Sequence, residues 1–344
     1  MEPVANTTRE REITAPVQLC LPDGRTLNPA AEGWSRLPLH TGNLRGSWGR
    51  TKRWDYWAIL AGDLVLSFTY ADVDYLGMAS VAWIDLATGT SGGHDSNLPL
   101  GHGISLPDQP GTTPLRYHGK SAALDIADDG DGNTITASWT ERDGRPATAQ
   151  VRVELPEGHE SLNVVIPWSE KRFQYTSKHQ ARPASGTLTL GDDVRSFDDA
   201  WGVLDVGRGR WPYSTRWNWG AGAGHSQQGS IVGLQFGAKW TEGTGFTENG
   251  VIVDGRLTKI GEELDWTYQW DEPMEPWRVR HPNGSLDVTL TPSYDRHAKV
   301  SALLLATEVH QVFGRWDGHV TSEDGIEHHF TDVMGFAEES RSRW

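Results

Sequence analysis

The sequence has 344 residues, a length that suits two domains or one large double-layered unit. Its 46 acidic and 31 basic residues give a formal net charge of −15, which disfavours nucleic acid and anionic membrane surfaces as partners. A single cysteine, Cys20, excludes an internal disulfide framework.

Nothing in the sequence indicates a targeting or membrane-spanning segment. Residues 1–12 are polar and charged, and the longest apolar stretches, such as 302–306, are far too short to cross a bilayer. We therefore expect a cytoplasmic protein, a monomer or homodimer, that neither inserts into membranes nor binds nucleic acid.

Short strand signals follow one another along most of the chain. The run 134–140 (TITASWT) alternates with period two and lies between turn-forming segments at 128–133 and 141–146. The best helix candidate, 196–201, has room for one or two turns at most. Similar strand runs, rich in β-branched and aromatic residues, occur at 150–155, 162–168, 186–190, 230–236, 250–253, 285–291 and 300–307. The sequence therefore predicts an all-β protein.

A weak internal repeat indicates a duplicated domain. Residues 132–143 (GNTITASWTERD) align with 284–295 (GSLDVTLTPSYD), about 150 residues further on, and 80–89 (SVAWIDLATG) resembles 249–259 (NGVIVDGRLTK). Two antiparallel barrels or sandwiches in tandem would give this pattern. We place the boundary within 183–196, which divides the chain into an N-terminal domain, 1–190, and a C-terminal domain, 191–344.

The segment 205–219 concentrates unusual residue types. Gly207 and Gly209 surround Arg208 and allow close backbone approach or positive φ. Asp205 beside apolar rings would lose water, which raises the pKa of a carboxylic acid and suits it to donate a proton to a substrate. Arg208 would oppose that shift or bind a substrate carboxylate. The aromatic wall would consist of Trp211, Tyr213, Trp217 and Trp219. Alternatively, Asp205 and Arg208 form a structural pair and the tryptophans only pack.

Other polar residues extend this candidate site. His179 could act as a base or as a hydrogen-bond partner of Asp205, and His310 occupies a comparable late position in the second half. Tyr56 and Tyr75 could form a polar cluster in the first half. Ordinary core, surface and turn roles explain these residues as well.

Several common mechanisms have no counterpart in the sequence. It contains no GxSxG elbow, no HExxH or CxxC pairing and no dinucleotide fingerprint, because the glycine-rich run 220–224 has the wrong spacing. We therefore expect neither a metal ion nor an organic cofactor.

Several stretches resemble the bacterial family called domain of unknown function 2804. They are 53–59 (RWDYWAI), 71–77 (ADVDYLG), 83–89 (WIDLATG), 201–220 (WGVLDVGRGRWPYSTRWNWG), 308–318 (EVHQVFGRWDG) and 335–344 (GFAEESRSRW). This resemblance implies no reaction.

A more remote resemblance concerns the tandem lipocalin-like proteins, which include carotenoid 1,2-hydratases and fungal cyclases of the Diels-Alder type. It rests on 178–188 (KHQARPASGTL), followed by Asp205 and then 217–220 (WNWG). The resemblance implies two lipocalin-like β-barrel or sandwich halves packed together, with apolar substrates bound in a barrel or at the junction. It also implies that an acidic residue protonates or polarises the substrate.

These observations give a leading hypothesis and two alternatives. The leading one is a cofactor-independent enzyme of hydratase, isomerase or cyclase type (a lyase or isomerase), acting on a small lipophilic molecule in an aromatic-lined cavity. The first alternative is a protein that binds a lipid or terpenoid without converting it. The second is a carbohydrate-active protein, because tryptophan platforms beside carboxylates also suit sugars.

Overall fold

Antiparallel β-strands make up nearly all of the regular structure. The computed structural model describes residues 8–302 and 305–343. Within these ranges the only helical element is a short 3₁₀ turn, Pro29–Ala31, and there is no α-helix. No helix in the described part of the chain has the length and apolar character needed to cross a membrane. The prediction of an all-β fold is confirmed.

The first half of the chain forms a 12-stranded sheet with the main order β7-β6-β5-β4-β14-β13-β11-β10-β9-β8. The strands are β4 (Thr51–Ala61), β5 (Leu64–Asp72), β6 (Leu76–Asp85), β7 (Thr90–Pro99), β8 (Leu115–His118), β9 (Ala122–Asp128), β10 (Gly132–Thr140), β11 (Pro146–Glu154), β13 (Arg172–Leu190) and β14 (Asp193–Arg210). Two further strands, β12 (Leu162–Ser169) and β2 (Trp34–Ser35), attach through β13. A separate parallel pair joins β1 (Val17–Gln18) to β3 (His40–Thr41).

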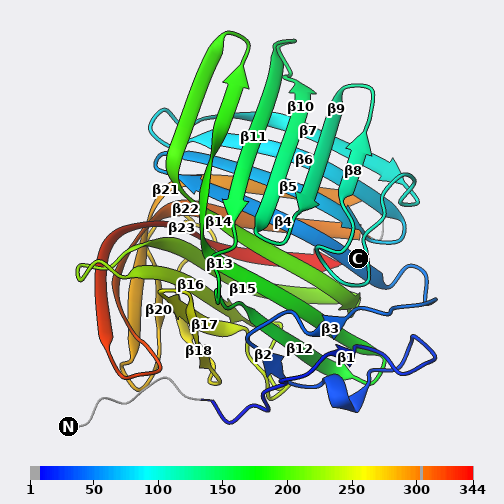
Figure 1. The fold of residues 1–344 in the computed structure, drawn as a ribbon, viewed down its shortest axis with the longest axis vertical. Coiled ribbons are helices and arrows are strands. Elements are labelled where there is room, and N and C mark those ends of the chain that lie inside the picture. The colour runs from blue at the N-terminus through cyan, green and yellow to red at the C-terminus, as the bar shows by residue number, and fades with distance from the viewer. Residues whose placement is uncertain (1–7, 303–304, 344) are drawn as a thin grey trace.

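The second half forms a 9-stranded sheet with the order β18-β17-β16-β15-β23-β22-β21-β20-β19. Its strands are β15 (Ser214–His225), β16 (Ile231–Ala238), β17 (Asn249–Val253), β18 (Arg256–Ile260), β19 (Asp265–Thr267), β20 (Trp277–Arg280), β21 (Leu286–Ala302), β22 (Leu305–Thr321) and β23 (Glu327–Arg343). In Figure 1 these strands curve through the lower left, whereas hairpins of the first sheet rise at the top.

The two sheets have the same strand order over nine positions, and β8, β12 and β2 of the first sheet have no counterpart in the second. The first long strand pairs with the last one, β4 with β14 and β15 with β23, and three further strands extend beside the first as a meander. Pairing of first and last strands is the arrangement of an up-and-down barrel, although each sheet stays open between its two edge strands. The chain therefore consists of two lipocalin-like halves in tandem, as expected.

The structure changes two details of the predicted organisation. The chain passes from one sheet to the other at 211–213, whereas the expected boundary at 190/191 lies in the turn between β13 and β14. Strands of the two sheets can be matched by counting outward from the pairs β4–β14 and β15–β23. By this count β6–β7 corresponds to β17–β18, as the predicted repeat has it. The repeat also aligned β10 with β21, but β10 corresponds to β20. Turn residues and alternating patterns recur in every hairpin, so they do not distinguish a linker from a turn or one strand from its neighbour.

Two predicted elements are wrong. The helix candidate 196–201 lies within β14, where it pairs with β13 from Ser196 opposite Thr187 to Trp201 opposite Pro183. Pairing with a neighbouring strand outweighs a weak local preference. The expected strand 300–307 contains the end of β21 and the start of β22, and its residues 303–304 lie outside the described residues.

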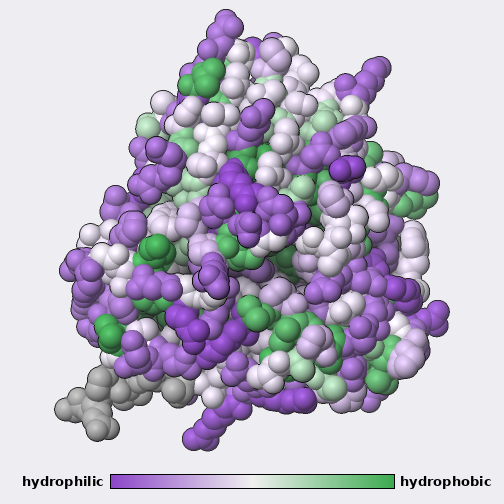
Figure 2. All heavy atoms as spheres, viewed as in Figure 1, coloured by the Kyte–Doolittle hydropathy of each residue, from purple (hydrophilic) through white to green (hydrophobic). Residues whose placement is uncertain are grey.

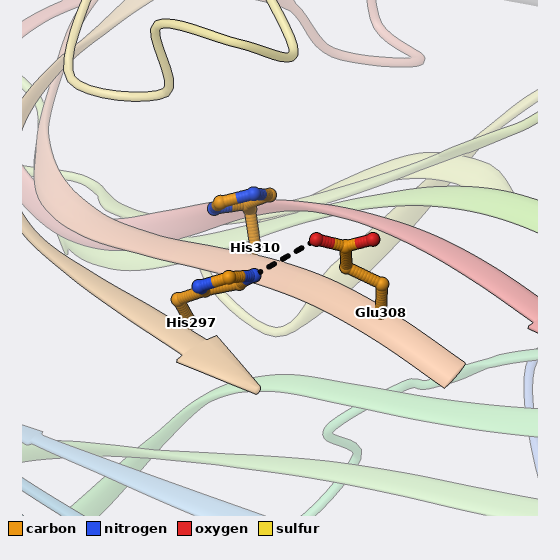
Figure 3. Close-up of side chains that lie close together, drawn as sticks. All are labelled: His297, Glu308 and His310. Atoms are coloured by element: carbon orange, nitrogen blue, oxygen red, sulfur yellow. Dashed lines mark hydrogen bonds and ion pairs between the residues drawn. The ribbon is translucent and has the colours of Figure 1, made fainter. Parts of the chain in front are cut away.

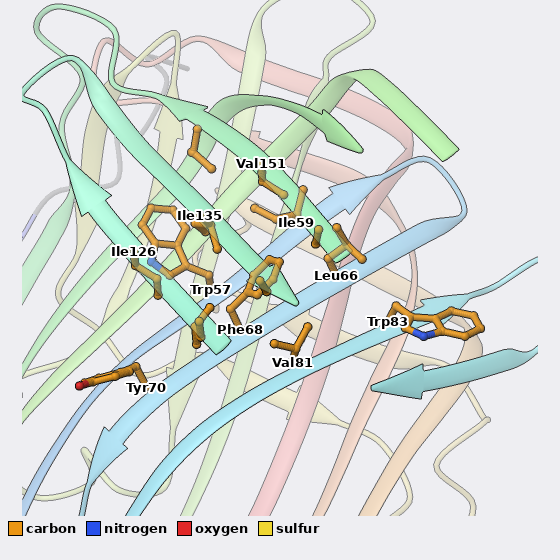
Figure 4. Packing of buried hydrophobic residues seen from close by; sticks show 14 of the residues in the cluster. Trp57, Ile59, Leu66, Phe68, Tyr70, Val81, Trp83, Ile126, Ile135 and Val151 are labelled. Carbon is orange, nitrogen blue, oxygen red and sulfur yellow. The ribbon is translucent and has the colours of Figure 1, made fainter. Parts of the chain in front are cut away.

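Each half has its own apolar core on one face of its sheet. In the first half Trp57 and Ile59 point into a core shared with Phe68 and Ile135, which Figure 4 shows from close by. Because side chains alternate along a strand, the next residues of β4 point the other way. There Ala58 belongs to a buried apolar cluster that also includes residues of the second sheet, such as Phe336.

The two sheets therefore meet through the faces that point away from their cores. The face of the molecule shown in Figure 2 is different in character, with mainly hydrophilic residues and hydrophobic ones scattered among them.

Candidate functional site

A cavity of about 410 Å³ lies between the two sheets. The first sheet and the residue after β5 line it with Trp54, Tyr56, Thr69, Ala71, Val73, Met78, Gln174, Thr176, Lys178 and Asp205. The second half and the linker contribute Trp211, Trp217, Trp219, Trp240, Glu248, Arg296, Ala298, Thr307, Val309, Gln311 and Glu338. The volume is within the range of pockets for small organic ligands.

Lys178 and Asp205 form an ion pair in this cavity. They lie directly opposite each other on β13 and β14, and Lys178 Nζ is 2.9 Å from Asp205 Oδ1. Asp205 also accepts hydrogen bonds from Trp54 Nε1, at 2.9 Å, and Thr176 Oγ1, at 3.3 Å. Burial alone would lower the pKa of Lys178, but the nearby carboxylates of Asp205 and Glu248 raise it above its usual value. Asp205 is thus held by three donors, one of them an ammonium group.

Glu248 is a second carboxyl group near the same ammonium. Its Oε1 accepts a hydrogen bond from Trp240 Nε1 at 2.6 Å, and its Oε2 lies 3.5 Å from Lys178 Nζ. Burial raises the pKa of Glu248 to about 7, although Lys178 opposes the shift. Gly237 provides the space, because a Cβ atom there would lie 2.1 Å from Glu248 Cγ.

Glu338 is the third buried carboxyl group. It lies on β23, and its Oε1 accepts a hydrogen bond from Trp217 Nε1 at 2.7 Å. Burial raises the pKa of Glu338 to about 7, against the opposing effects of Trp217 and Lys178. Within the described chain no basic group lies within 4.0 Å of its carboxylate oxygens. Glu338 is therefore the carboxyl group best suited to hold and release a proton near neutral pH.

The tryptophans do more than fill space. Each of the three carboxyl groups accepts one indole N–H, from Trp54, Trp240 or Trp217. Trp211 lies at the centre of the wall, with ring centroids 5.0 to 5.8 Å from those of Trp54, Trp168, Trp217 and Trp240. The indoles thus orient the carboxyl groups and also exclude water from them.

The two glycines of the 205–219 segment allow close approach. A Cβ atom at Gly207 would lie 2.2 Å from the Trp54 ring, whose N–H reaches Asp205. One at Gly209 would lie 2.1 Å from Gln174 Oε1, which accepts a hydrogen bond from the Trp211 indole at 2.8 Å. Neither glycine has a positive φ.

Of the residues expected at the site, Asp205, Tyr56, Trp211, Trp217 and Trp219 line the cavity, and the others do not. Strand alternation explains three of the exceptions, which are Arg208, His179 and His310.

Arg208 points to the opposite face of β14 and is completely buried there, with Nη2 2.8 Å from Asp55 Oδ1. His179 points away from the Lys178 side and lines a separate pocket of about 110 Å³. There its Nε2 is 2.9 Å from Ser177 Oγ, and burial lowers its pKa to about 3.

The remaining three expected residues also lie elsewhere. Tyr213 is 41% exposed in the linker between the sheets, and Tyr75 carries the buried Lys52 ammonium 4.2 Å above its ring. His310 lies on the face of β22 opposite the cavity, where its Nδ1 is 2.7 Å from Asp295 Oδ2.

His310 belongs to a cluster with His297 and Glu308, whose potential metal-ligand atoms lie within 4.8 Å of one another (Figure 3). The two imidazole rings are stacked, with centroids 4.2 Å apart and planes 1° from parallel. The lone pair of an imidazole nitrogen lies in the ring plane, so these two parallel rings do not converge on one ion. Glu308 also lies 3.1 Å from the Lys299 ammonium. As it stands, this arrangement is a stacked, ion-paired surface cluster.

Sequence reasoning missed four charged residues of the cavity: Lys178, Glu248, Arg296 and Glu338. Lys178 precedes His179, and only the face of β13 distinguishes them. Glu338 is within the run 335–344, which resembles the family, but its neighbour Glu339 is equally acidic.

Solved structures with a similar arrangement have little sequence identity to this chain. CghA is 9% identical, with 86% of this chain and 89% of that chain covered and a TM-score of 0.46. Kievitone hydratase from Nectria haematococca is 10% identical, with 99% and 97% covered and a TM-score of 0.46. A candidate AttH from Nitrosomonas europaea is 13% identical, with 85% and 92% covered and a TM-score of 0.47.

No curated protein sequence matches the chain. Residues 10–344 match the family described as Domain of unknown function (DUF2804), and the chain therefore belongs to this family.

Proposed function

We propose that this protein is an enzyme that protonates a small, largely apolar molecule and thereby hydrates, isomerises or cyclises it, with Glu338 as the proton donor. The observation that carries the proposal is the placement of three buried carboxyl groups and one ammonium group inside an indole-lined cavity. Burying ionisable groups costs several kcal/mol each, and a site that only held an apolar molecule would not need them.

The proposal assigns each group a separate role. Glu338 can carry a proton near neutral pH and transfer it to an alkene or carbonyl group. The positive charge left on the substrate would face indole rings and the anionic Asp205, both of which stabilise cations. Loss of a proton to Glu248 then gives an isomerised or cyclised product. Addition of water before that loss gives a hydrate. Lys178 holds Asp205 and Glu248 in position throughout.

The test begins with ligand identification. The full-length protein is incubated with a mixture of terpenoids, polyenes and other apolar compounds, and native mass spectrometry identifies those that bind or change. Turnover of the selected compound is then compared between the unmodified protein, Glu338→Gln and the control Glu327→Gln. Glu327 is an exposed residue of the same strand.

We expect Glu338→Gln to bind the compound but to convert it at least about 100-fold more slowly, whereas the control keeps full activity. Undiminished turnover by Glu338→Gln would remove Glu338 as the donor. Binding without conversion by the unmodified protein would favour the non-catalytic alternative, and selective binding of a glycan would favour the carbohydrate one.

A further inference from the structure

Arg296 is a charged residue at the open end of the cavity. Among the lining residues of its strand, Ala298 is exposed, and Thr307 on the neighbouring strand is half-buried, so the cavity opens here. Arg296 Nη1 donates a hydrogen bond to Ser67 Oγ at 3.0 Å. In the described ranges of the chain no carboxylate lies within 4.0 Å of its guanidinium group.

Two further hydrogen-bonding groups lie beside Arg296. Gln311 is its direct partner across the β21–β22 pair and also lines the cavity. The Gln311 side-chain amide is within hydrogen-bond distance of Tyr56 Oη, at 3.3 Å from its nitrogen. The guanidinium, amide and phenol groups therefore offer hydrogen-bond donors to a ligand in the cavity.

An apolar ligand alone would leave this end poorly matched. A molecule that fills the cavity displaces water from Arg296, and a desolvated guanidinium group is costly unless an anion pairs with it. The planar fork of N–H groups fits a carboxylate in a two-point contact.

We infer that the ligand of this cavity is a carboxylic acid with an apolar body, whose carboxylate binds Arg296 while the body lies against the indoles. The inference rests on the proposed function and deepens it by naming the class of substrate.

Such a ligand would also affect the proposed proton donor. The positive charge of Arg296 helps to lower the pKa of Glu338. A bound carboxylate neutralises that charge, so Glu338 holds its proton more firmly when the substrate is in place. Recognition and protonation of the substrate are coupled in this way.

The test measures the affinities of cis-parinaric acid and its methyl ester, which share one apolar body, from energy transfer between the cavity tryptophans and the polyene. The variants are Arg296→Gln and Arg296→Lys, with Arg278→Gln as a matched control. Arg278 is an exposed arginine that pairs with Asp287 outside the cavity. Glu338→Gln serves as a further comparison.

For the unmodified protein and the control we expect the acid to bind roughly 10- to 100-fold more tightly than the ester, the range for a charged hydrogen-bonded contact. Arg296→Gln removes this preference by weakening acid binding alone, and Arg296→Lys retains part of it. Glu338→Gln should increase the preference, because it removes a carboxyl group that competes with the ligand carboxylate for the positive charge of Arg296.

Equal binding of acid and ester by the unmodified protein overturns the inference and leaves the proposed function intact. An unchanged preference in Arg296→Gln overturns it as well. If neither compound binds, the inference is overturned as well, whereas the proposed function is tested separately by the mixture of apolar compounds.

Discussion

The indole N–H of Trp217 donates a hydrogen bond to Oε1 of Glu338 at 2.7 Å, across the pairing of β15 with β23. The two residues are far apart in the sequence but belong to the first and last strands of the second sheet, which pair with each other. The contact fixes the orientation of a buried carboxyl group without supplying the positive charge that would keep it ionised. Glu338 can therefore remain protonated near neutral pH while its position stays defined.

Folding stability should depend on pH through Glu338. A carboxyl group with a higher pKa in the folded than in the unfolded protein binds more protons when folded, so the free energy of unfolding falls as pH rises between the two values. For Glu338 this window runs from its ordinary value of 4.5 to about 7. Above it, Glu338→Gln should be more stable than the unmodified protein, by on the order of 2 kcal/mol.

Urea unfolding of both proteins, below and above that window, measures this difference. The glutamine side chain of the variant keeps an oxygen that can accept the Trp217 hydrogen bond, so the substitution isolates the charge. A variant that loses equal stability at both pH values would show that Glu338 has no unusual proton affinity.

Lys178 should be essential for stability because it faces two buried carboxyl groups. Lys178→Met leaves Asp205 and Glu248 without their cation, and loss of one partner from a buried ion pair costs about 3–5 kcal/mol. Chemical denaturation of Lys178→Met, Asp205→Asn and the double variant gives the coupling free energy. We expect the double variant to be more stable than the sum of the single effects predicts. Strict additivity would contradict the ion pair.

A side chain at Gly207 should destabilise the protein, because the Trp54 ring covers the backbone of this glycine. Gly207→Ala is expected to cost about 1–3 kcal/mol and to displace the indole that donates to Asp205. Gly224→Ala is the comparison, since its nearest contact is the side chain of Val333 at 3.0 Å and its other neighbours lie at 3.5 Å. Thermal unfolding should show a clearly larger loss for Gly207→Ala; similar losses would contradict the proposed packing.

The N-terminal segment should stabilise the second half through a buried ion pair. Glu10 Oε1 lies 2.7 Å from Lys259 Nζ, and burial lowers the pKa of Lys259 to about 8. Glu10→Gln should destabilise the protein by roughly 2 kcal/mol at neutral pH and by less at about pH 9.5, where Lys259 is uncharged.

Unfolding at the two pH values tests this expectation, with Glu12→Gln as the control. Glu12 forms a more exposed ion pair with Arg36, so its replacement should cost little. A loss from Glu10→Gln that is independent of pH would show that the charge of Lys259 is not involved.

The sequence was sufficient to predict the class of fold and part of the site. Alternating patterns and turn residues identify strands locally, and the segment 205–219 concentrates tryptophans that do line the cavity. Local patterns do not show which strands pair. For this reason the sequence did not reveal that 196–201 is part of a strand, or that the chain changes sheet at 211–213.

The charged residues of the cavity could be identified only from the structure. Lys178 reaches Asp205 because β13 and β14 pair in a register that sets the two residues opposite each other. Glu338 faces the cavity because β23 pairs with β15, while its neighbour Glu339 points to the other side and pairs with Lys239. A shift of one residue in either pairing would exchange the two faces.

Direct titration of Glu338 shows whether the cavity contains a carboxyl group that is protonated near neutral pH, and it requires no knowledge of the substrate. Carboxyl ¹³C NMR of protein labelled at glutamate side chains, compared with Glu338→Gln, identifies the resonance of this residue. We expect a signal that titrates near pH 7 in the unmodified protein and is missing from the variant, with the signal of Glu248 remaining. A Glu338 resonance that titrates near the ordinary glutamate value of 4.5 would show that this carboxyl group is ionised at neutral pH and cannot be the proton donor.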